Sequence, residues 1–354
     1  MNRLDDDATY ALDASGMFRH IESLGDEFQA AWAASSTMAL PAGRPASVTV
    51  AGMGGSASAA DYFEALLTPE APVPIAIVRD YRLPRHVGSG SLVVVVSYSG
   101  TTEEAISCFD EAVSRGCQTI SVTTGGELAA RAAAAGQPVH QIDYEAPPRA
   151  ALGHMLAPLL RLGATAGAAP FADATVAAAA AGHRRLVEQT LGIAVPAAAN
   201  PAKRIAHTMT VGATPVVFAA EHLVAAGRRA KNQFAENAKT LSAFEVVPEA
   251  THNTIVSLEA TTGPVQLGIA FDSPLLATGN QRRLEVTSRL YEERGFAFHR
   301  IELSGESALS DLLEATAYAD FISCYLAMMR GLDPTPTPNL TRMRTAVASA
   351  PTVA

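Results

Sequence analysis

The most informative segment of the chain is Val93-Val94-Val95-Val96-Ser97-Tyr98-Ser99-Gly100-Thr101-Thr102-Glu103-Glu104. Its continuous run of valines predicts a strand buried on both faces, which is typical of a parallel sheet. The strand ends in a turn, and Thr101 or Thr102 then caps a helix that has Glu103 and Glu104 in its first turn. Hydroxyl groups, backbone N–H groups and a helix N-terminus therefore meet at the carboxyl end of a parallel strand.

This arrangement predicts an anion-binding site whose size suits one phosphate monoester. The turn at residues 97–102 supplies four hydroxyl groups around Gly100, from Ser97, Ser99, Thr101 and Thr102. A helix cap requires fewer hydroxyl groups than that. The alternative is an ordinary capped strand-to-helix turn, in which serine and threonine are also common.

A second glycine-rich turn follows an earlier predicted strand at residues 47–51 and reads Gly52-Met53-Gly54-Gly55-Ser56-Ala57. Its Gly-x-Gly-x-x-Ala spacing also fits a dinucleotide-binding turn, which requires an acidic residue about twenty positions further on. Asp80 comes somewhat late for that role, although Arg79 beside it would suit a 2′-phosphate. Ser56 places a hydroxyl group where a dinucleotide site prefers bare backbone. We therefore favour two turns that converge on one phosphate, and an NADP-dependent oxidoreductase is the alternative.

Composition limits the classes of protein to consider. A chain of 354 residues with 48% hydrophobic and 17% charged residues suggests about two globular domains. The balance of 26 basic to 35 acidic side chains gives a net charge of −9, which argues against a nucleic-acid partner. The three cysteines have no metal-ligand spacing and are typical of reduced thiols. With an acidic N-terminus unlike a signal peptide and no apolar run long enough for a membrane span, we expect a cytoplasmic protein without membrane segments.

Strands alternate with helices along the whole chain, which predicts an α/β fold with parallel sheets. A lead-in helix at 11–34 precedes strands at 47–51, 73–78, 92–97, 119–122 and 139–142, and a helix at 149–167 closes this half. An alanine-rich helix at 172–191 follows, then helices near 203–210, 223–239, 281–293 and 307–330 and strands at 215–219, 265–271 and 296–303. We expect two similar domains, 1–168 and 169–332, and a proline-stiffened tail, 333–354, that reaches the active site.

The two turns together resemble those of a sugar isomerase (SIS) domain, an αβα sandwich of flavodoxin type. The later stretch Gln233-Phe234-Ala235-Glu236-Asn237-Ala238-Lys239, followed by Glu249-Ala250-Thr251-His252-Asn253, resembles the bifunctional phosphoglucose/phosphomannose isomerases of that superfamily. The resemblance runs from Asp13 to Arg344 and so covers nearly the whole chain. It implies metal-independent, cofactor-free interconversion of glucose 6-phosphate, and of mannose 6-phosphate, with fructose 6-phosphate through a cis-enediolate.

The resemblance also implies a role for each site residue. Glu236 would be the base that moves a proton between C1 and C2, Arg149 would face the enediolate oxygens, and His252 would open the sugar ring. In similar isomerases this histidine comes from the partner subunit, which implies a homodimer with shared sites. The phosphate would be anchored by Gly54, Gly55, Ser56, Ser97, Ser99, Thr101 and Thr102.

The chain departs from the family pattern at two positions. Arg344 stands where the family has a lysine, and arginine stabilises charge but does not shuttle a proton as readily. Thr254 follows His-Asn where the family commonly has an acidic residue. Thr337 lines the sugar pocket or is a plain linker residue, and both Glu236 and Arg149 also fit solvated surface positions.

No histidine or cysteine spacing suits a metal, so we expect a metal-free mechanism. The alternative for the whole chain is a regulator that binds sugar phosphate without turnover.

Overall fold

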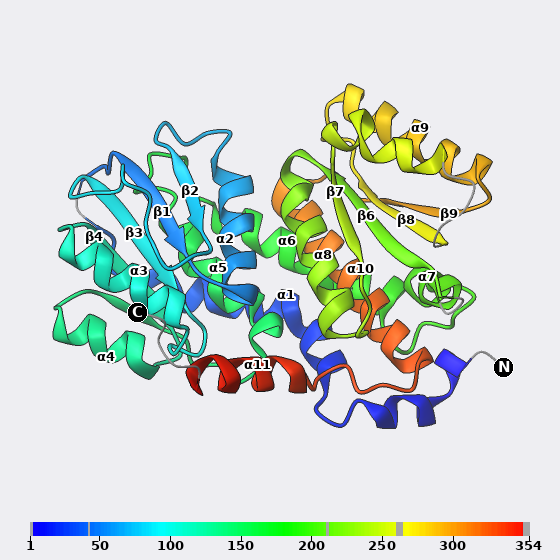
Figure 1. Cartoon of the computed structure of the whole chain (residues 1–354), viewed down its shortest axis with the longest axis horizontal. Coiled ribbons are helices and arrows are strands. Elements are labelled where there is room, and N and C mark those ends of the chain that lie inside the picture. Colours follow the sequence, from blue (N-terminus) through cyan, green and yellow to red (C-terminus); the bar gives the residue numbers. More distant parts are fainter. Residues whose placement is uncertain (1–2, 42, 210–211, 260–264, 350–354) are drawn as a thin grey trace.

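The computed structural model describes residues 3–41, 43–209, 212–259 and 265–349. Figure 1 shows two sheets side by side, with helices packed between them. The predicted α/β fold with two parallel sheets is confirmed. Within the described ranges, no helix combines the length and apolar character needed to cross a membrane.

The first sheet consists of β1 (Ser47–Ala51), β2 (Ile75–Val78), β3 (Ser91–Val96), β4 (Gln118–Thr123) and β5 (Val139–Gln141). All neighbouring strands are parallel, in the order β2-β1-β3-β4-β5. Every residue of β3 is buried, as the valine run predicts. From β1 the chain continues to β2 on one side of the sheet, and from β3 it continues to β4 on the other side. The carboxyl ends of these two strands therefore form the switch point at which doubly wound sheets bind ligands.

The second sheet repeats this plan with one strand fewer. It consists of β6 (Thr214–Ala220), β7 (Ala243–Val247), β8 (Gln266–Asp272) and β9 (Ala297–Glu302), all parallel and in the order β7-β6-β8-β9. Strand β7 was not predicted; it is an edge strand with mostly half-buried residues. The prediction of two similar parallel-sheet units is confirmed.

The α-helices follow the predicted alternation. They are α1 (Met17–Ala34), α2 (Gly54–Leu67), α3 (Glu103–Ser114), α4 (Gly126–Ala134), α5 (Leu152–Arg161), α6 (Asp173–Leu186), α7 (Pro201–Thr208), α8 (Val224–Glu236), α9 (Thr278–Glu293), α10 (Ala308–Met329) and α11 (Pro338–Ser349). Helix α2 of the first half packs against α8 of the second, and α8 packs against α10. The Tyr62 and Thr316 hydroxyl groups lie 2.5 Å apart between α2 and α10. The two halves are thus joined through a helical layer that starts at the first sheet's switch point.

Two predicted helix boundaries were wrong by six residues, and others by two or three. The lead-in helix begins at Met17 because the Asp13 carboxylate accepts hydrogen bonds from the N–H groups of Met17 (2.8 Å) and Phe18 (2.9 Å), after Gly16 at φ 72°. The helix predicted to end near residue 167 ends at Arg161 and continues as turns. The alanine-rich segment is helical as predicted, and its last part widens into a π-helix, Val187–Leu191.

Candidate active site

The two predicted turns meet at the switch point of the first sheet. The backbone N–H of Tyr98 donates to Ser56 Oγ at 3.2 Å, which joins the turn at 97–102 to the turn at 52–56. Ser97 Oγ donates to Thr102 Oγ1 at 3.1 Å, and the hydroxyl groups of Ser99 and Thr101 also lie 3.1 Å apart. The structure therefore brings together the hydroxyl groups that the sequence predicted would share one anion.

Glycine is required at the centre of the later turn. Gly100 has φ +66°, and a Cβ atom there would lie 1.8 Å from the carbonyl oxygen of Gly125. The turn can therefore bend tightly only because residue 100 lacks a side chain.

Two helix N-termini point into this region. Helix α2 begins at Gly54, and α3 begins immediately after Thr102. In the described part of the chain, neither helix has a side-chain cap at its first turn. The N–H of Ser56 donates to the carbonyl oxygen of Met53 at 3.1 Å, and the other first-turn N–H groups and the positive end of each helix dipole can bind an anion. The arrangement suits a phosphate group.

The 52–56 turn lies directly against the segment that carries Arg149. A Cβ atom at Gly55 would lie 2.8 Å from the carbonyl oxygen of Pro148 and 3.2 Å from the backbone nitrogen of Arg149. Any larger residue at position 55 would push the two segments apart. Gly55 thus sets the spacing between the predicted phosphate site and the predicted arginine.

Arg149 is buried, with 5% of its surface exposed, and other parts of the chain hold its guanidinium group. Nε donates to Asn237 Oδ1 at 2.7 Å, and Nη2 donates to the carbonyl oxygens of Pro334 (2.8 Å) and Thr335 (2.9 Å). Nη1 lies 3.5 Å from Glu236 Oε2. Burial lowers the pKa of Arg149, and the negative charge of Glu236 opposes that shift. The guanidinium group is therefore fixed in place and faces the carboxylate.

Glu236 is the last residue of α8, and 28% of its side chain is exposed, so a substrate can reach it. Two neighbours that the sequence analysis gave no role support its position. Asn237 Nδ2 donates to Ser323 Oγ at 3.0 Å, and Lys239 Nζ donates to the carbonyl oxygens of Glu236 (2.8 Å) and Pro334 (3.0 Å). Burial lowers the pKa of Lys239. The Glu-Asn-x-Lys motif was the available signal for both residues.

The structure separates His252 from Glu236 within this chain, whereas Thr337 lies two positions after Thr335, whose carbonyl oxygen accepts a hydrogen bond from Arg149. His252 is exposed in the short helix Glu249–His252, which follows β7, whereas Glu236 precedes β7. Helix α8 runs back along the second sheet from the end of β6 towards the start of β7 (Figure 1). Glu236 ends α8 and His252 follows β7, so the two residues belong to opposite ends of this sheet. Thr337 is half-buried, and its carbonyl oxygen accepts a hydrogen bond from Leu340 at the start of α11. Arg344 is exposed on α11.

A cavity of about 410 Å³ borders the 52–56 turn at Gly54. It is lined by Gly54, Ala57, Ser58, Asp61, Arg79, Arg228, Lys231, Asn232 and Phe244. Asp61 pairs with Arg79 and, at 3.2 Å, with Arg228. Arg79 thus already binds a carboxylate, which weakens the suggestion that it recognises a 2′-phosphate.

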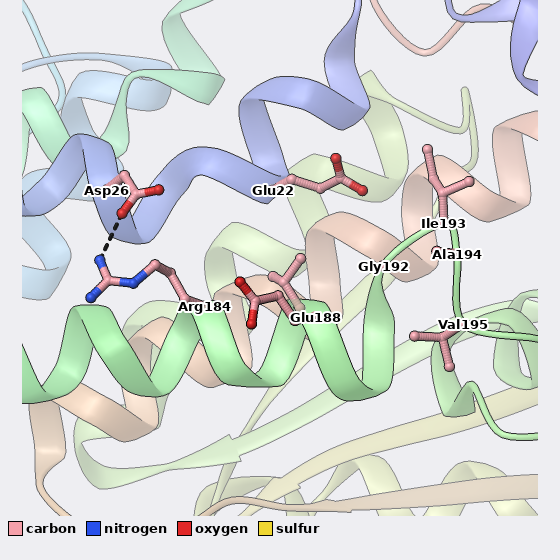
Figure 2. A pocket seen from close by; sticks show the side chains of 9 residues that line it. Glu22, Asp26, Arg184, Glu188, Gly192, Ile193, Ala194 and Val195 are labelled. Atoms are coloured by element: carbon pink, nitrogen blue, oxygen red, sulfur yellow. Dashed lines mark hydrogen bonds and ion pairs between the residues drawn. The ribbon is translucent and has the colours of Figure 1, made fainter.

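A second cavity, of about 300 Å³, lies between α1 and the end of α6 (Figure 2). Glu22, Asp26 and Glu188 make its lining acidic, and Arg184 pairs with Asp26 at 2.7 Å. It shares no lining residue with the two turns. Over the described residues, no group of three His, Cys, Asp or Glu side chains is arranged to hold a metal ion.

Known proteins resemble this chain over most of its length. The family model of the bacterial phospho-glucose isomerase C-terminal SIS domain matches residues 198–347. The chain is 30% identical over 328 residues to a bifunctional phosphoglucose/phosphomannose isomerase of Caldicellulosiruptor bescii, covering 90% of this chain and 95% of the relative. It is 29% identical over 304 residues to a protein of the same name from Aquifex aeolicus, covering 84% and 89%. A solved structure of a hypothetical protein from Thermus thermophilus has the same fold, with a TM-score of 0.74 at 17% identity over 98% of this chain and 95% of that one.

Proposed function

The chain belongs to the bifunctional phosphoglucose/phosphomannose isomerase family, and on that basis we propose that it interconverts glucose 6-phosphate and mannose 6-phosphate with fructose 6-phosphate. One observation carries the proposal at the level of geometry. The hydroxyl-lined turns contact the backbone at Arg149, and the guanidinium group of Arg149 faces the carboxylate of Glu236 at 3.5 Å. We infer from these contacts that an anion anchor, a buried cation and an accessible base form one site.

The phosphate group of the substrate would bind at the two turns. The hydroxyl groups of Ser56, Ser97, Ser99, Thr101 and Thr102 and the first-turn N–H groups of α2 and α3 would donate to its oxygens. The backbone N–H groups of Gly54 and Gly55 would be among these donors. This anchor would place the other end of the sugar beside Arg149 and Glu236.

The proton transfer would then proceed through a cis-enediolate. The carboxylate of Glu236 removes the proton from C2 of the open-chain aldose, the C–H electron pair forms the C1–C2 double bond, and O1 gains the negative charge. The guanidinium group of Arg149 stabilises that charge. Glu236 returns the proton to C1 while the O2 proton passes to O1, which leaves the ketose. Before the proton is removed from C2, rotation of the open chain about C2–C3 can turn either face of C2 towards Glu236. The same base can therefore act on both the glucose and the mannose epimer.

We further propose that the chain forms a homodimer in which His252 of one copy opens the sugar ring at the site of the other. The topology supports this, because β7 separates His252 from Glu236 within one chain and a strand of five residues spans roughly 16 Å. His252 is exposed, so a second copy can receive it. Ring opening needs an acid–base group that titrates near neutrality, which suits histidine.

The C-terminal tail would contribute two residues to the sugar pocket. Arg344, on the exposed helix α11, would add positive charge near the sugar, and Thr337 would border the pocket.

The reaction would need no metal, since Glu236 supplies the base and Arg149 the charge stabilisation. We place the enzyme in the cytoplasm, because Cys108, Cys117 and Cys324 are free thiols.

The test is an assay of the purified protein with fructose 6-phosphate in the presence of EDTA, in which glucose 6-phosphate and mannose 6-phosphate are measured separately. We expect both products. Thermal stabilisation by fructose 6-phosphate without turnover would instead identify a non-catalytic sugar-phosphate regulator. Stabilisation by NADP but not by sugar phosphates would identify an oxidoreductase.

A further inference from the structure

Tyr98 lies in the turn at residues 97–102 and forms hydrogen bonds with three separate segments of the chain. Its N–H donates to Ser56 Oγ at 3.2 Å. Its carbonyl oxygen accepts from the N–H of Thr124 at 3.0 Å and from Thr124 Oγ1 at 2.6 Å. The backbone of Tyr98 thus joins the two turns to the loop after β4.

The hydroxyl group of Tyr98 bonds the segment that leads to Arg149. It donates to the carbonyl oxygen of Tyr144 and accepts from the N–H of Ala146 at 2.9 Å. These two bonds hold residues 144–146, which have no regular secondary structure, directly before Pro147-Pro148-Arg149. The hydroxyl group of one side chain therefore joins the predicted phosphate site to the backbone that carries the buried arginine.

Tyr144 anchors the same segment on its other side. Its ring stacks on His154 of α5 with centroids 4.3 Å apart, and its hydroxyl group donates to the Glu27 carboxylate of α1. His20 Nδ1 lies 2.8 Å from the same hydroxyl group. The 144–146 segment is thus held between a rigid helical support and Tyr98.

We propose that Tyr98 is a positioning residue for the isomerisation, whose hydroxyl group fixes the distance between the bound phosphate and Arg149. This inference rests on the proposed function. The guanidinium end of Arg149 is held by Asn237 and the tail carbonyl groups, and Tyr98 holds the backbone end relative to the phosphate. The substrate is anchored at one point and acted on at another, so this distance controls the reaction. A misplacement of about 1 Å between such groups can lower a rate by roughly 100-fold.

Replacing Tyr98 by phenylalanine removes only the hydroxyl group and leaves every phosphate contact in place. We expect kcat of Tyr98→Phe to fall roughly 10- to 100-fold. The KM for fructose 6-phosphate and the inhibition constant for inorganic phosphate should stay within about threefold of wild type, because the anchor is retained. Tyr291→Phe is the matched control: it removes a 2.8 Å hydrogen bond to Gln266 in the second half and should leave kcat unchanged. An unchanged kcat in Tyr98→Phe would overturn the inference.

A double-mutant cycle with Arg149→Lys separates positioning from a general loss of stability. If Tyr98 acts through Arg149, Tyr98→Phe will lower kcat much less in the Arg149→Lys background than in wild type. Equal losses in both backgrounds would show that Tyr98 acts independently of Arg149 and would contradict the proposal.

Amide hydrogen exchange tests the role of the Tyr98 hydroxyl group without measuring enzyme activity. Without the acceptor at Tyr98, the N–H of Ala146 should exchange at least about tenfold faster in Tyr98→Phe, with no change there in Tyr291→Phe. An unchanged exchange rate at Ala146 would overturn the inference even if the wild-type protein isomerises sugars. Faster exchange in a wild-type protein that turns over no sugar phosphate would instead mean that the proposed function alone has failed.

Discussion

The guanidinium group of Arg149 and the carboxylate of Glu236 lie 3.5 Å apart, although they come from different halves of the chain. The guanidinium group of Arg149 does not depend on Glu236 for its place. Arg149 is held by Asn237 and two carbonyl groups, and Lys239 bonds the backbone of Glu236. Glu236 can therefore change its protonation state during a reaction while Arg149 stays fixed.

Replacing Glu236 by glutamine tests the assignment of the base. The amide keeps the shape and one acceptor oxygen but cannot take a proton, so kcat should fall by roughly 10²- to 10⁴-fold. The inhibition constant for inorganic phosphate should be unchanged, because the anchor is separate. Glu292→Gln, at an exposed position of α9, is the matched control and should behave as wild type. Retention of more than about a tenth of the wild-type kcat would show that another group is the base.

Mixed dimers test whether His252 acts across an interface. Co-expression of Glu236→Gln and His252→Asn chains, each inactive alone, gives about half mixed dimers. In each mixed dimer one site keeps both wild-type residues if the histidine crosses over. The mixture should then recover about a quarter of the wild-type kcat. No recovery from mixed dimers isolated through two different affinity tags would mean that each chain uses its own histidine, or none.

The hydroxyl groups of the 97–102 turn should contribute to binding rather than to the chemical step. Ser97→Ala removes one donor to a charged phosphate, and such hydrogen bonds contribute about 1.5–3 kcal/mol. We therefore expect the KM for fructose 6-phosphate and the inhibition constant for inorganic phosphate to rise together by at least about tenfold, with a smaller change in kcat. Ser114→Ala, on an exposed turn of α3, is the control. A fall in kcat with an unchanged phosphate inhibition constant would contradict the anchor role.

Stability should depend on pH through His183. This residue is fully buried between α6 and α1, and among the described residues neither ring nitrogen has a hydrogen-bond partner. Burial lowers the pKa of His183 to about 4, well below its ordinary value near 6.5. The unfolded chain therefore takes up a proton more readily, and this contribution to the unfolding free energy is present above pH 6.5 and is lost as the pH falls towards 4, by up to about 3 kcal/mol.

Urea unfolding of wild type and His183→Leu between pH 7 and pH 4 measures this difference. The free energy of unfolding should decrease less steeply in the variant, because leucine cannot be protonated. Parallel pH profiles in the two proteins would show that His183 gains a partner or reaches water when it is protonated.

The sequence predicted the strands well where burial leaves a strong pattern. All five strands of the first sheet and three of the second lie within two residues of their expected ranges. The edge strand β7 was missed because its sequence, Ala-Phe-Glu-Val-Val, is short, carries a charge and lacks the continuous apolar run of a strand buried on both faces. The helix predicted from residue 11 begins six residues later because Asp13 caps it through its side chain, an effect that periodicity does not show.

The candidate site could be predicted only in part. The meeting of the two turns follows from the strand order, since carboxyl ends of neighbouring parallel strands lie together. The contacts of Arg149 with the carbonyl groups of Pro334 and Thr335 could not be predicted, because backbone acceptors carry no sequence signature and lie far along the chain. The same holds for the hydroxyl group of Tyr98, whose partners are backbone groups of Tyr144 and Ala146.

The carbonyl groups at residues 334 and 335 have a consequence for the order of events during synthesis. The N-terminal part of the chain leaves the ribosome first. The first sheet and the hydroxyl-lined turns can therefore form while the second half is still being synthesised. Arg149 would then lack the acceptors that hold its guanidinium group until residue 335 has left the exit tunnel. A nascent chain can therefore carry a finished first domain in which the guanidinium group of Arg149 is not yet held in its final position.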